Sequence, residues 1–238
     1  MNYLAQVLGI IFDLDGVLFD SEPLWDESVT ATFNYFYNVI PSLDIAQTIQ
    51  VRSNPSILAA LIEKYYPQYS SLQEEVERTN AYLEEHFITN MTSRINFFPE
   101  VQKVLEKLLE LGISLSIASN APKKVVSEIV TKNLFLRTQF HPIFTIDDVT
   151  NGKPNPEMLF KAMRILGIEP MNMLFVGDSL STDGEASSAA GIPFVLLDRN
   201  NTKKGGSNDY LSIKSLTELI DLVNSQNLEE NAKEFQNV

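Results

Sequence analysis

The sequence predicts an α/β fold: a Rossmann-like, mostly parallel sheet with helices on both faces and an inserted helical cap domain. Three observations support this prediction. The first apolar run, Val7–Phe12, has the length and hydrophobicity of a buried strand. From Gly112 to Leu197 short apolar runs alternate with helical patterns, which is typical of parallel strands joined by helical crossovers. Residues 24–92 contain no glycine and few strand-like runs, so we expect them to be helical.

The helical segment is expected to begin near Pro23, because proline is favoured in the first turn of a helix. Its last helix is expected over Leu72–Phe87. We expect residues 21–92 to form the helical cap and residues 1–20 and 93–238 to form the α/β core. Three later prolines divide the cap into four expected helices: Pro41, Pro55 and Pro67.

In the second half of the chain, amphipathic helices and apolar strands follow one another. The helix that opens at Pro99 has apolar residues at the spacing of one helix face, and Gly112 fits its end. Gly167 and Gly191 end two later helices in the same way. The expected helices cover residues 99–111, 123–132, 156–166, 183–190 and 216–223. The expected strands cover residues 113–118, 143–145, 173–176, 193–197 and 209–213.

Composition and charge exclude several classes of function. The formal net charge of −13 leaves no basic surface of the kind that nucleic acids and anionic membranes require, so we expect neither as a partner. The absence of cysteine excludes disulfides, thiolate nucleophiles and cysteine-based metal sites. Asp13 interrupts the first apolar run, so neither a signal peptide nor a spanning helix fits there. We therefore expect a cytoplasmic protein that is a monomer or a weak dimer.

Polar side chains follow several of the expected strands at the point where each strand ends. Asp13 and Asp15 follow the first strand, and alternation along an extended backbone points both side chains the same way. Because open α/β sheets bind ligands at the carboxyl ends of their strands, we expect these residues to share one site. The later members of this group are Ser119, Asn120, Lys153, Asp178 and Asp183.

This group of residues suits a hard divalent cation and a phosphoryl group. A single aspartate at a strand end is more often a helix cap, but four acids with a lysine, a hydroxyl and an amide are hard to explain by capping. Asp13 and Asp178 offer carboxylate ligands, and the Leu14 carbonyl oxygen offers a third. Such an incomplete oxygen set is typical of Mg²⁺, which keeps several waters and binds phosphate oxygens. Asp15 is then a candidate general acid and base.

Four motifs in this order resemble those of the haloacid dehalogenase superfamily. The resemblance covers nearly the whole chain, because residues 21–92 fall where the helical cap lies in the branch of phosphoglycolate phosphatase and β-phosphoglucomutase. The four matching stretches are Asp13–Glu22, Ser119-Asn120, Lys153-Pro154, and Gly177-Asp178-Ser179 with Asp183.

The resemblance implies a role for each of these residues. Asp13 would attack the substrate and form an aspartyl-phosphate, while Asp15 would protonate the leaving group and then activate water. Mg²⁺ would be held by Asp13, the Leu14 carbonyl and Asp178, with Asp183 acting through water or by orienting its neighbours. The groups that would steady the transferring phosphoryl are Ser119, Asn120 and Lys153.

Within the expected cap, Val51-Arg52-Ser53 resembles a Gly-Arg-Ser loop that reaches the active site in this branch. Arg52 is therefore a candidate substrate contact, although valine replaces the glycine and Arg52 is equally compatible with an exposed charge at a helix end. The expected function is a Mg²⁺-dependent phosphomonoesterase for a small phosphorylated metabolite, such as a sugar phosphate or phosphoglycolate.

Two alternatives to this function stay open. One is a β-phosphoglucomutase-like sugar-phosphate mutase, which would use the same nucleophile. Such mutases usually carry Glu-Asp in the fourth motif, whereas Gly177-Asp178 favours a phosphatase. The other is a catalytically weak relative that serves as a metabolite sensor or interaction protein.

Overall fold

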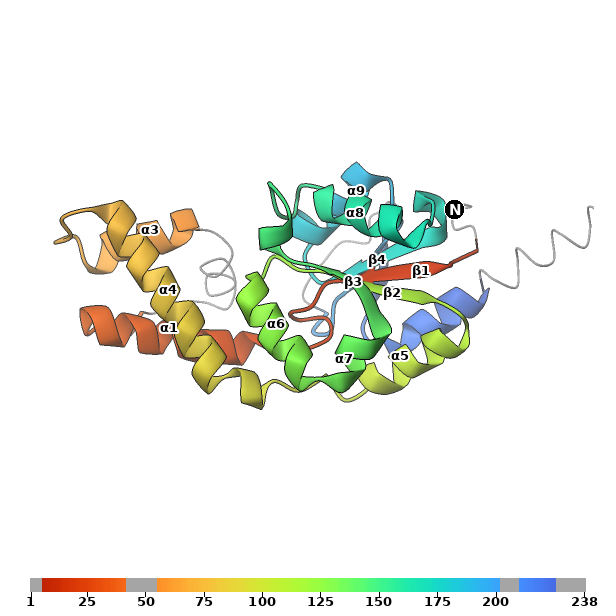
Figure 1. The fold of residues 1–238 in the computed structure, drawn as a ribbon, viewed down its shortest axis with the longest axis horizontal. Helices are drawn as coiled ribbons and strands as arrows, with labels where there is room; N and C mark the ends of the chain where they lie inside the picture. Colours follow the sequence, from red (N-terminus) through yellow and green to blue (C-terminus); the bar gives the residue numbers. More distant parts are fainter. Residues whose placement is uncertain (1–5, 42–54, 202–209, 226–238) are drawn as a thin grey trace, which may run out of the picture. The chain divides into compact units, whose positions relative to one another are not determined.

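The computed structural model describes residues 6–41, 55–201 and 210–225. Within them, six strands form one sheet in the order β3-β2-β1-β4-β5-β6. Strands β1 to β4 are labelled in Figure 1. Every neighbouring pair is parallel, which confirms the predicted fold class. The strands are β1 (Gly9–Phe12), β2 (Ser114–Ala118), β3 (Phe140–Phe144), β4 (Met173–Gly177), β5 (Phe194–Leu197) and β6 (Leu211–Ile213).

Strand β1 lies at the point where the strand order reverses. Phe12 at its end pairs with Ile117 of β2 on one side and Val176 of β4 on the other. The chain runs outward from β1 through β2 to β3, and then crosses back to the far side of β1 to form β4. Ligands of open α/β sheets bind at the carboxyl ends of the strands at such a reversal. The residues that follow β1, β2 and β4 are therefore brought together there.

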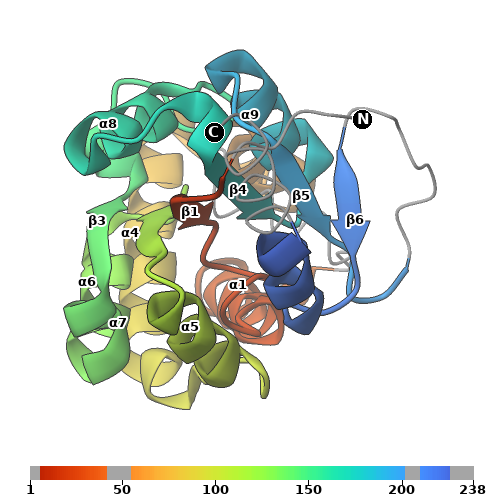
Figure 2. The same ribbon diagram turned by 90° about the vertical axis from the view of Figure 1, so that its right-hand side faces the viewer.

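Helices cover both faces of this sheet (Figure 2). Helices α8 (Glu157–Leu166) and α9 (Glu185–Ala190) lie on one face, while α5 (Val101–Glu110) and a helix over residues 217–225 lie on the other. Gly167 ends α8 in the left-handed conformation, with φ of 67°, as its predicted position requires. The face of α5 that is buried has the predicted helical spacing: Val101, Val104, Leu105 and Leu108.

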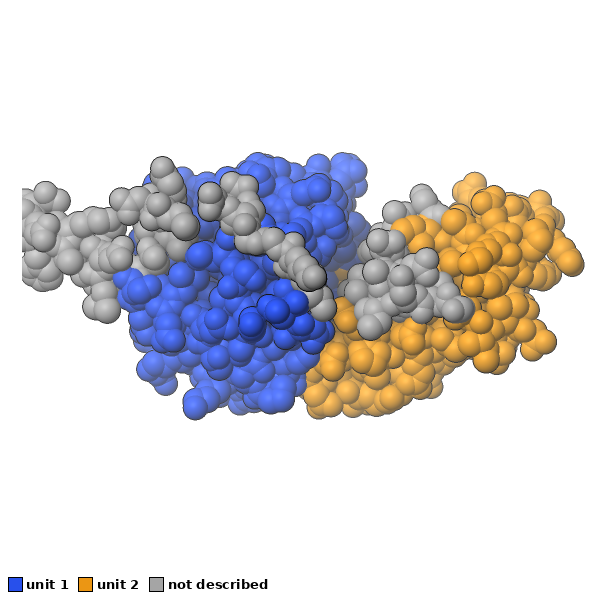
Figure 3. Space-filling view, turned by 180° about the vertical axis from the view of Figure 1, so that it is seen from behind, with its two compact units in different colours: residues 1–19, 97–120, 134–238 blue, residues 20–96, 121–133 orange. Residues whose placement is uncertain are grey.

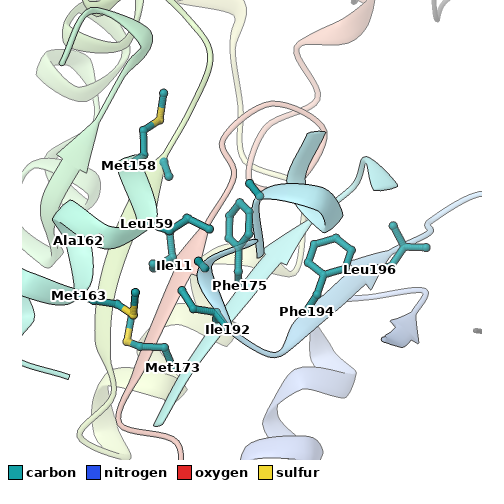
Figure 4. Packing of buried hydrophobic residues seen from close by; sticks show 13 residues of the cluster. Ile11, Met158, Leu159, Ala162, Met163, Met173, Phe175, Ile192, Phe194 and Leu196 are labelled. Carbon is teal, nitrogen blue, oxygen red and sulfur yellow. The ribbon is translucent and has the colours of Figure 1, made fainter. Parts of the chain in front are cut away.

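A cluster of buried apolar side chains joins the sheet to α8 and α9 (Figure 4). Ile11 of β1 and Phe175 of β4 point into it, as do Phe194 and Leu196 of β5. Helix α8 contributes Met158, Leu159, Ala162 and Met163. The strand residues between them are buried as well, as expected for a parallel sheet that is covered on both faces. This packing fixes the strand ends that carry the polar residues.

Two stretches differ from the predicted elements. An additional helix, α7 (Leu134–Gln139), leads directly into β3, which begins before the predicted strand. The helix predicted from residue 183 begins instead as a wide π-helical turn, η4 (Leu180–Gly184), and becomes α9 afterwards. In that turn the backbone N–H groups of Asp183 and Gly184 both donate to the Ser179 carbonyl oxygen, at 2.9 and 3.0 Å.

The chain divides into two compact units (Figure 3). One contains residues 1–19, 97–120 and 134–238 and holds the sheet; we call it the sheet unit. The other contains residues 20–96 and 121–133, and we call it the helical unit.

That residues 21–92 act as a cap stays a prediction. Three short 3₁₀-helices complete the described elements: η1 (Thr92–Arg94), η2 (Ile146–Asp148) and η3 (Pro170–Asn172).

The helical unit has its own core. Trp25 of α1 (Glu22–Tyr37) stacks on Phe87 of α4 (Leu72–Asn90), with ring centroids 3.6 Å apart, and both side chains are buried. Lys124 of α6 (Lys123–Lys132) forms an ion pair with Glu85 of α4, with an N–O distance of 2.6 Å. The described helices of this unit are α1 (Glu22–Tyr37), α3 (Pro55–Tyr65), α4 (Leu72–Asn90) and α6 (Lys123–Lys132).

No helix in the described part of the chain combines the length and apolar character needed to span a membrane. The stretch 42–54, which contains the candidate residue Arg52, lies outside the described residues.

Candidate active site

Lys153 joins two buried carboxylates at the carboxyl edge of the sheet. Its ammonium nitrogen lies 2.8 Å from Asp13 Oδ1 and 2.7 Å from Asp183 Oδ1. Asp13 directly follows β1, and its backbone N–H donates to the Val176 carbonyl oxygen of β4 at 2.9 Å. The same Asp13 Oδ1 accepts the backbone N–H of Leu14 at 2.8 Å. Three predicted site residues, far apart in sequence, are therefore brought together here.

Burial and charge set the protonation of this group. Burial raises the pKa of Asp13 to about 6, against the lowering effect of the Lys153 ammonium and with further raising by the Asp183 and Asp15 carboxylates. Burial also raises the pKa of Asp183. For Lys153, burial lowers the pKa, but the charges of Asp13 and Asp183 outweigh it, so the net shift is upward. Lys153 therefore carries its positive charge at neutral pH.

Three acids at this edge fit a divalent cation. Asp13, Asp178 and Asp183 each place one carboxylate oxygen within 4.8 Å of the others. Carboxylate oxygens are the ligands that Mg²⁺ prefers. The Asp183 carboxylate is already engaged, because Oδ1 pairs with Lys153 and Oδ2 accepts the Ser179 backbone N–H at 3.1 Å. Both oxygens of Asp183 are therefore used within the protein, and which of the three acids would hold a metal ion stays a prediction.

The Leu14 carbonyl oxygen, predicted as a third metal ligand, is used inside the turn that follows β1. It accepts the backbone N–H groups of Leu18 at 3.0 Å and Phe19 at 3.2 Å. A carbonyl oxygen has two lone pairs, and these two bonds use both. That this oxygen also binds a metal ion stays a prediction.

Asp15 lies in the same turn and is buried. Its backbone forms a short parallel bridge with that of Phe19, in which the Gly16 N–H donates to the Phe19 carbonyl oxygen at 2.9 Å. Gly16 has φ of 74°, a left-handed conformation that glycine adopts without strain. The turn thus places Asp15 next to Asp13, near enough for its charge to raise the Asp13 pKa.

Ser119 and Asn120 follow β2, as predicted. Ser119 is buried, and its backbone N–H donates to the Phe144 carbonyl oxygen at the end of β3, at 3.0 Å. The Asn120 side chain binds the backbone of Lys153 twice: Oδ1 accepts its N–H at 2.9 Å, and Nδ2 donates to its carbonyl oxygen at 2.8 Å. This positioning role was not predicted. A contact from Ser119 or Asn120 to substrate stays a prediction.

Two glycines leave the space that these side chains occupy. A Cβ at Gly152 would lie 2.6 Å from Asn120 Oδ1 and 2.2 Å from Ile146 Cδ1. A Cβ at Gly177 would lie 2.4 Å from Asp183 Cβ and 2.5 Å from its Cγ and Oδ2. Asn120 and Asp183, which both contact Lys153, therefore each pack directly on a glycine. In the sequence, a glycine directly precedes Lys153 and another directly precedes Asp178. The sequence does not say which side chain fills the space beside each glycine.

Comparison with known proteins identifies the family. Residues 10–197 match the haloacid dehalogenase-like hydrolase family. The chain belongs to this family. A phosphoglycolate phosphatase of Salmonella typhi is 28% identical over 214 residues, which cover 83% of each chain. The pyrophosphatase PpaX of Oceanobacillus iheyensis is 30% identical over 222 residues, which cover 90% of this chain and 95% of that one.

A solved structure shares the fold of this haloacid dehalogenase-like hydrolase. It is a predicted phosphoglycolate phosphatase of Haemophilus somnus, with a TM-score of 0.75 and 22% sequence identity. The match covers 92% of this chain and 98% of that chain. The predicted family and the predicted hydrolase class are therefore confirmed.

Proposed function

We propose that this haloacid dehalogenase-like hydrolase is a Mg²⁺-dependent phosphomonoesterase that acts on a small phosphorylated metabolite through an aspartyl-phosphate on Asp13. The observation that carries the proposal is the double ion pair of Lys153 with Asp13 and Asp183, beside the Asp178 carboxylate. It combines a buried carboxylate, a fixed cation and a cluster of metal-binding oxygens. Phosphoryl transfer depends on this combination, because it is catalysed mainly by positioning and charge.

The relatives support a small phosphorylated substrate. Those compared above carry the names phosphoglycolate phosphatase and pyrophosphatase. The net charge of −13 opposes an anionic substrate at long range, so a local positive charge is required. Lys153 supplies part of it, and a divalent cation would supply the rest. We place a sugar phosphate or a phosphoglycolate-like compound first among candidate substrates.

Asp13 is the proposed nucleophile. An Asp13 carboxylate oxygen attacks the phosphorus, and the bond between phosphorus and the leaving oxygen breaks as Asp15 gives that oxygen a proton. Asp15 then takes a proton from a water molecule that attacks the phosphorus of the phosphorylated Asp13. The bond between phosphorus and the Asp13 oxygen breaks, so inorganic phosphate is released and the Asp13 carboxylate is restored. Lys153 holds the attacking carboxylate in its ionised form and offsets negative charge on the transferring group.

Asp13 and Asp178 are the proposed Mg²⁺ ligands. Bound there, the ion would neutralise charge on the phosphoryl oxygens and align them with the nucleophile. Asp183 keeps Lys153 in place through its 2.7 Å ion pair, while Asn120 holds the Lys153 backbone. In this assignment Asp183 acts through Lys153, while Asn120 holds the Lys153 backbone and is also a proposed phosphoryl contact, together with Ser119.

A screen of phosphorylated metabolites, measured by released phosphate with and without Mg²⁺, tests the proposal. The wild type should release phosphate only with the metal, and Asp13→Asn should fall to background. Asp221→Asn, an exposed acid on the helix over residues 217–225, is the matched control and should keep full activity. Rapid acid quenching should leave a phosphoryl group on the peptide that contains Asp13.

Two outcomes would overturn the proposal. One is a wild type that releases no phosphate from any compound, and the other is an Asp13→Asn variant that keeps its activity. Isomerised product with little free phosphate would identify a mutase instead.

A further inference from the structure

Arg199 binds the turn that carries Asp15. It follows β5, and its Nη2 donates to the Val17 carbonyl oxygen at 2.9 Å, while its Nε lies 3.5 Å from the Gly16 carbonyl oxygen. Its Nη1 forms an ion pair with the Glu100 carboxylate. The guanidinium also lies over the Phe98 ring, 3.7 Å from the ring centroid. All three nitrogens of the guanidinium and one of its faces therefore make a contact.

These contacts connect three separate segments of the sheet unit. Gly16 and Val17 follow β1, Phe98 and Glu100 precede α5, and Arg199 follows β5. A planar guanidinium can donate along two edges while its face stacks on an aromatic ring, which a lysine ammonium cannot do. The position therefore depends on arginine in particular, and not only on a positive charge.

The turn is held both by its own hydrogen bonds and by Arg199 from outside it. Gly16, directly after Asp15, has a left-handed φ and the conformational freedom of glycine. On one side the turn is closed by its own hydrogen bonds to Leu14 and Phe19. The Gly16 and Val17 carbonyl oxygens contact Arg199. Asp13 is fixed by its bond to β4, so Asp15 lies between one anchor in the sheet and a second anchor at Arg199.

We infer that Arg199, held by Glu100, is a positioning residue that fixes Asp15 for proton transfer. This inference rests on the proposed function, in which Asp15 protonates the leaving oxygen. A general acid must lie within hydrogen-bond reach of that oxygen, and a displacement of about 1 Å can cost roughly a hundredfold in rate. Arg199 touches neither substrate nor metal in this assignment and acts through the turn alone.

The leaving group separates this role from simple stabilisation of the fold. An alkyl phosphate needs a proton on its leaving oxygen, whereas 4-nitrophenyl phosphate has a leaving group that is stable without one. Single-turnover release of the leaving group isolates the step in which Asp15 gives its proton. Arg199→Lys should slow this step about 10- to 100-fold with an alkyl phosphate, and less than about threefold with 4-nitrophenyl phosphate.

Two other variants sharpen the comparison. Asp15→Asn should show the same dependence on the leaving group with a larger loss of rate. With the alkyl phosphate we expect the release step to slow by about 10²- to 10⁴-fold. Glu100→Gln should show the same dependence with a smaller loss of rate. Its loss should not add to that of Arg199→Lys in the double variant, because the two residues form one contact. Arg164→Lys, on the exposed side of α8, is the matched control and should leave both rates unchanged.

The outcomes decide the inference and the proposed function separately. Equal slowing of Arg199→Lys with both compounds, or no slowing, would overturn the inference while a working wild type upholds the function. A wild type inactive on both compounds would overturn the function and the inference with it. If Arg199→Lys does not fold, the same comparison with Glu100→Gln decides the question.

Discussion

Gly177 has no side chain, and Asp183 occupies the space that a Cβ would need. Gly177→Ala should therefore push Asp183 away from Lys153. We expect kcat to fall about 10- to 100-fold, since Lys153 would lose one of its two anchors, and the free energy of unfolding to fall by about 1–3 kcal/mol from overpacking. Steady-state kinetics and chemical denaturation measure the two effects.

Gly184→Ala is the matched control for this substitution. A Cβ at Gly184 would meet Phe194 at 3.4 Å, which is an ordinary contact, and its backbone is already helical. Activity should stay near that of the wild type. Equal losses in Gly177→Ala and Gly184→Ala would show that the space beside Asp183 has no special importance.

The Asp13 carboxyl makes stability depend on pH. Its folded-state pKa of about 6 lies above the ordinary value of 3.8, so between these pH values the folded protein holds a proton that the unfolded chain has lost. The stabilising contribution of Asp13 is therefore present below about pH 4 and lost as the pH rises through about 6. Without Mg²⁺, the melting temperature of the wild type relative to Asp13→Asn should fall across that range.

Mg²⁺ should reverse this effect at neutral pH, because a cation bound to Asp13 favours the ionised carboxylate. Melting curves of both proteins between about pH 4 and pH 7, in chelator and in Mg²⁺, measure it. Parallel curves for the wild type and Asp13→Asn would contradict the assignment.

At the scale of elements, the helices of the helical unit depend on contacts between their aromatic side chains. Phe87 of α4 is buried and stacks on Trp25 of α1. Phe87→Ala should lower the free energy of unfolding by about 3–5 kcal/mol, because it leaves a cavity against the indole. Trp25 fluorescence during denaturation measures the loss. Thr89→Ala, exposed on the same helix, should cost less than about 1 kcal/mol.

Most elements could be predicted from the sequence because their ends are marked locally. Helix α6 (Lys123–Lys132) has the predicted bounds, and Gly167 ends α8 where its position indicated. Strand β3 was predicted too short because Pro142 lies inside it. Proline cannot donate to a sheet, but β3 is an edge strand, where that hydrogen bond is dispensable.

The residues at the sheet edge could be predicted for a similar reason. Parallel strands end at one edge, so Asp13, Ser119 and Asp178 had to lie near one another once the strands were assigned. The two hydrogen bonds between the Asn120 side chain and the Lys153 backbone could not be predicted. They join two loops whose conformations no local pattern specifies. The Arg199 contacts depend on three such segments and were missed for the same reason.

At the scale of the whole molecule, each of the two units has a core of its own. The lack of glycine in residues 24–92 indicated a separate helical region. Residues 121–133 also belong to the helical unit, which could not be predicted from the sequence. An amphipathic pattern shows that a helix packs on something, but not on which neighbour.

The two units should respond differently to Mg²⁺. The acids that would bind the ion all lie in the sheet unit. A ligand stabilises the part of a protein that binds it. Mg²⁺ should therefore raise the free energy of unfolding of the sheet unit more than that of the helical unit. Hydrogen exchange at β1 and β4, compared with α1 and α4, measures the difference. Equal protection of all four elements would show that the units unfold as one.

Trp25 is the single tryptophan of the chain, and it lies in the helical unit, whereas the described candidate site residues lie in the sheet unit. The indole emission therefore reports on the helical unit, and not directly on the candidate site. A change in indole emission when a phosphate mimic and Mg²⁺ are added would be a signal passed between the units, recorded without any label. Stopped-flow mixing would give the rate of this change in emission during turnover.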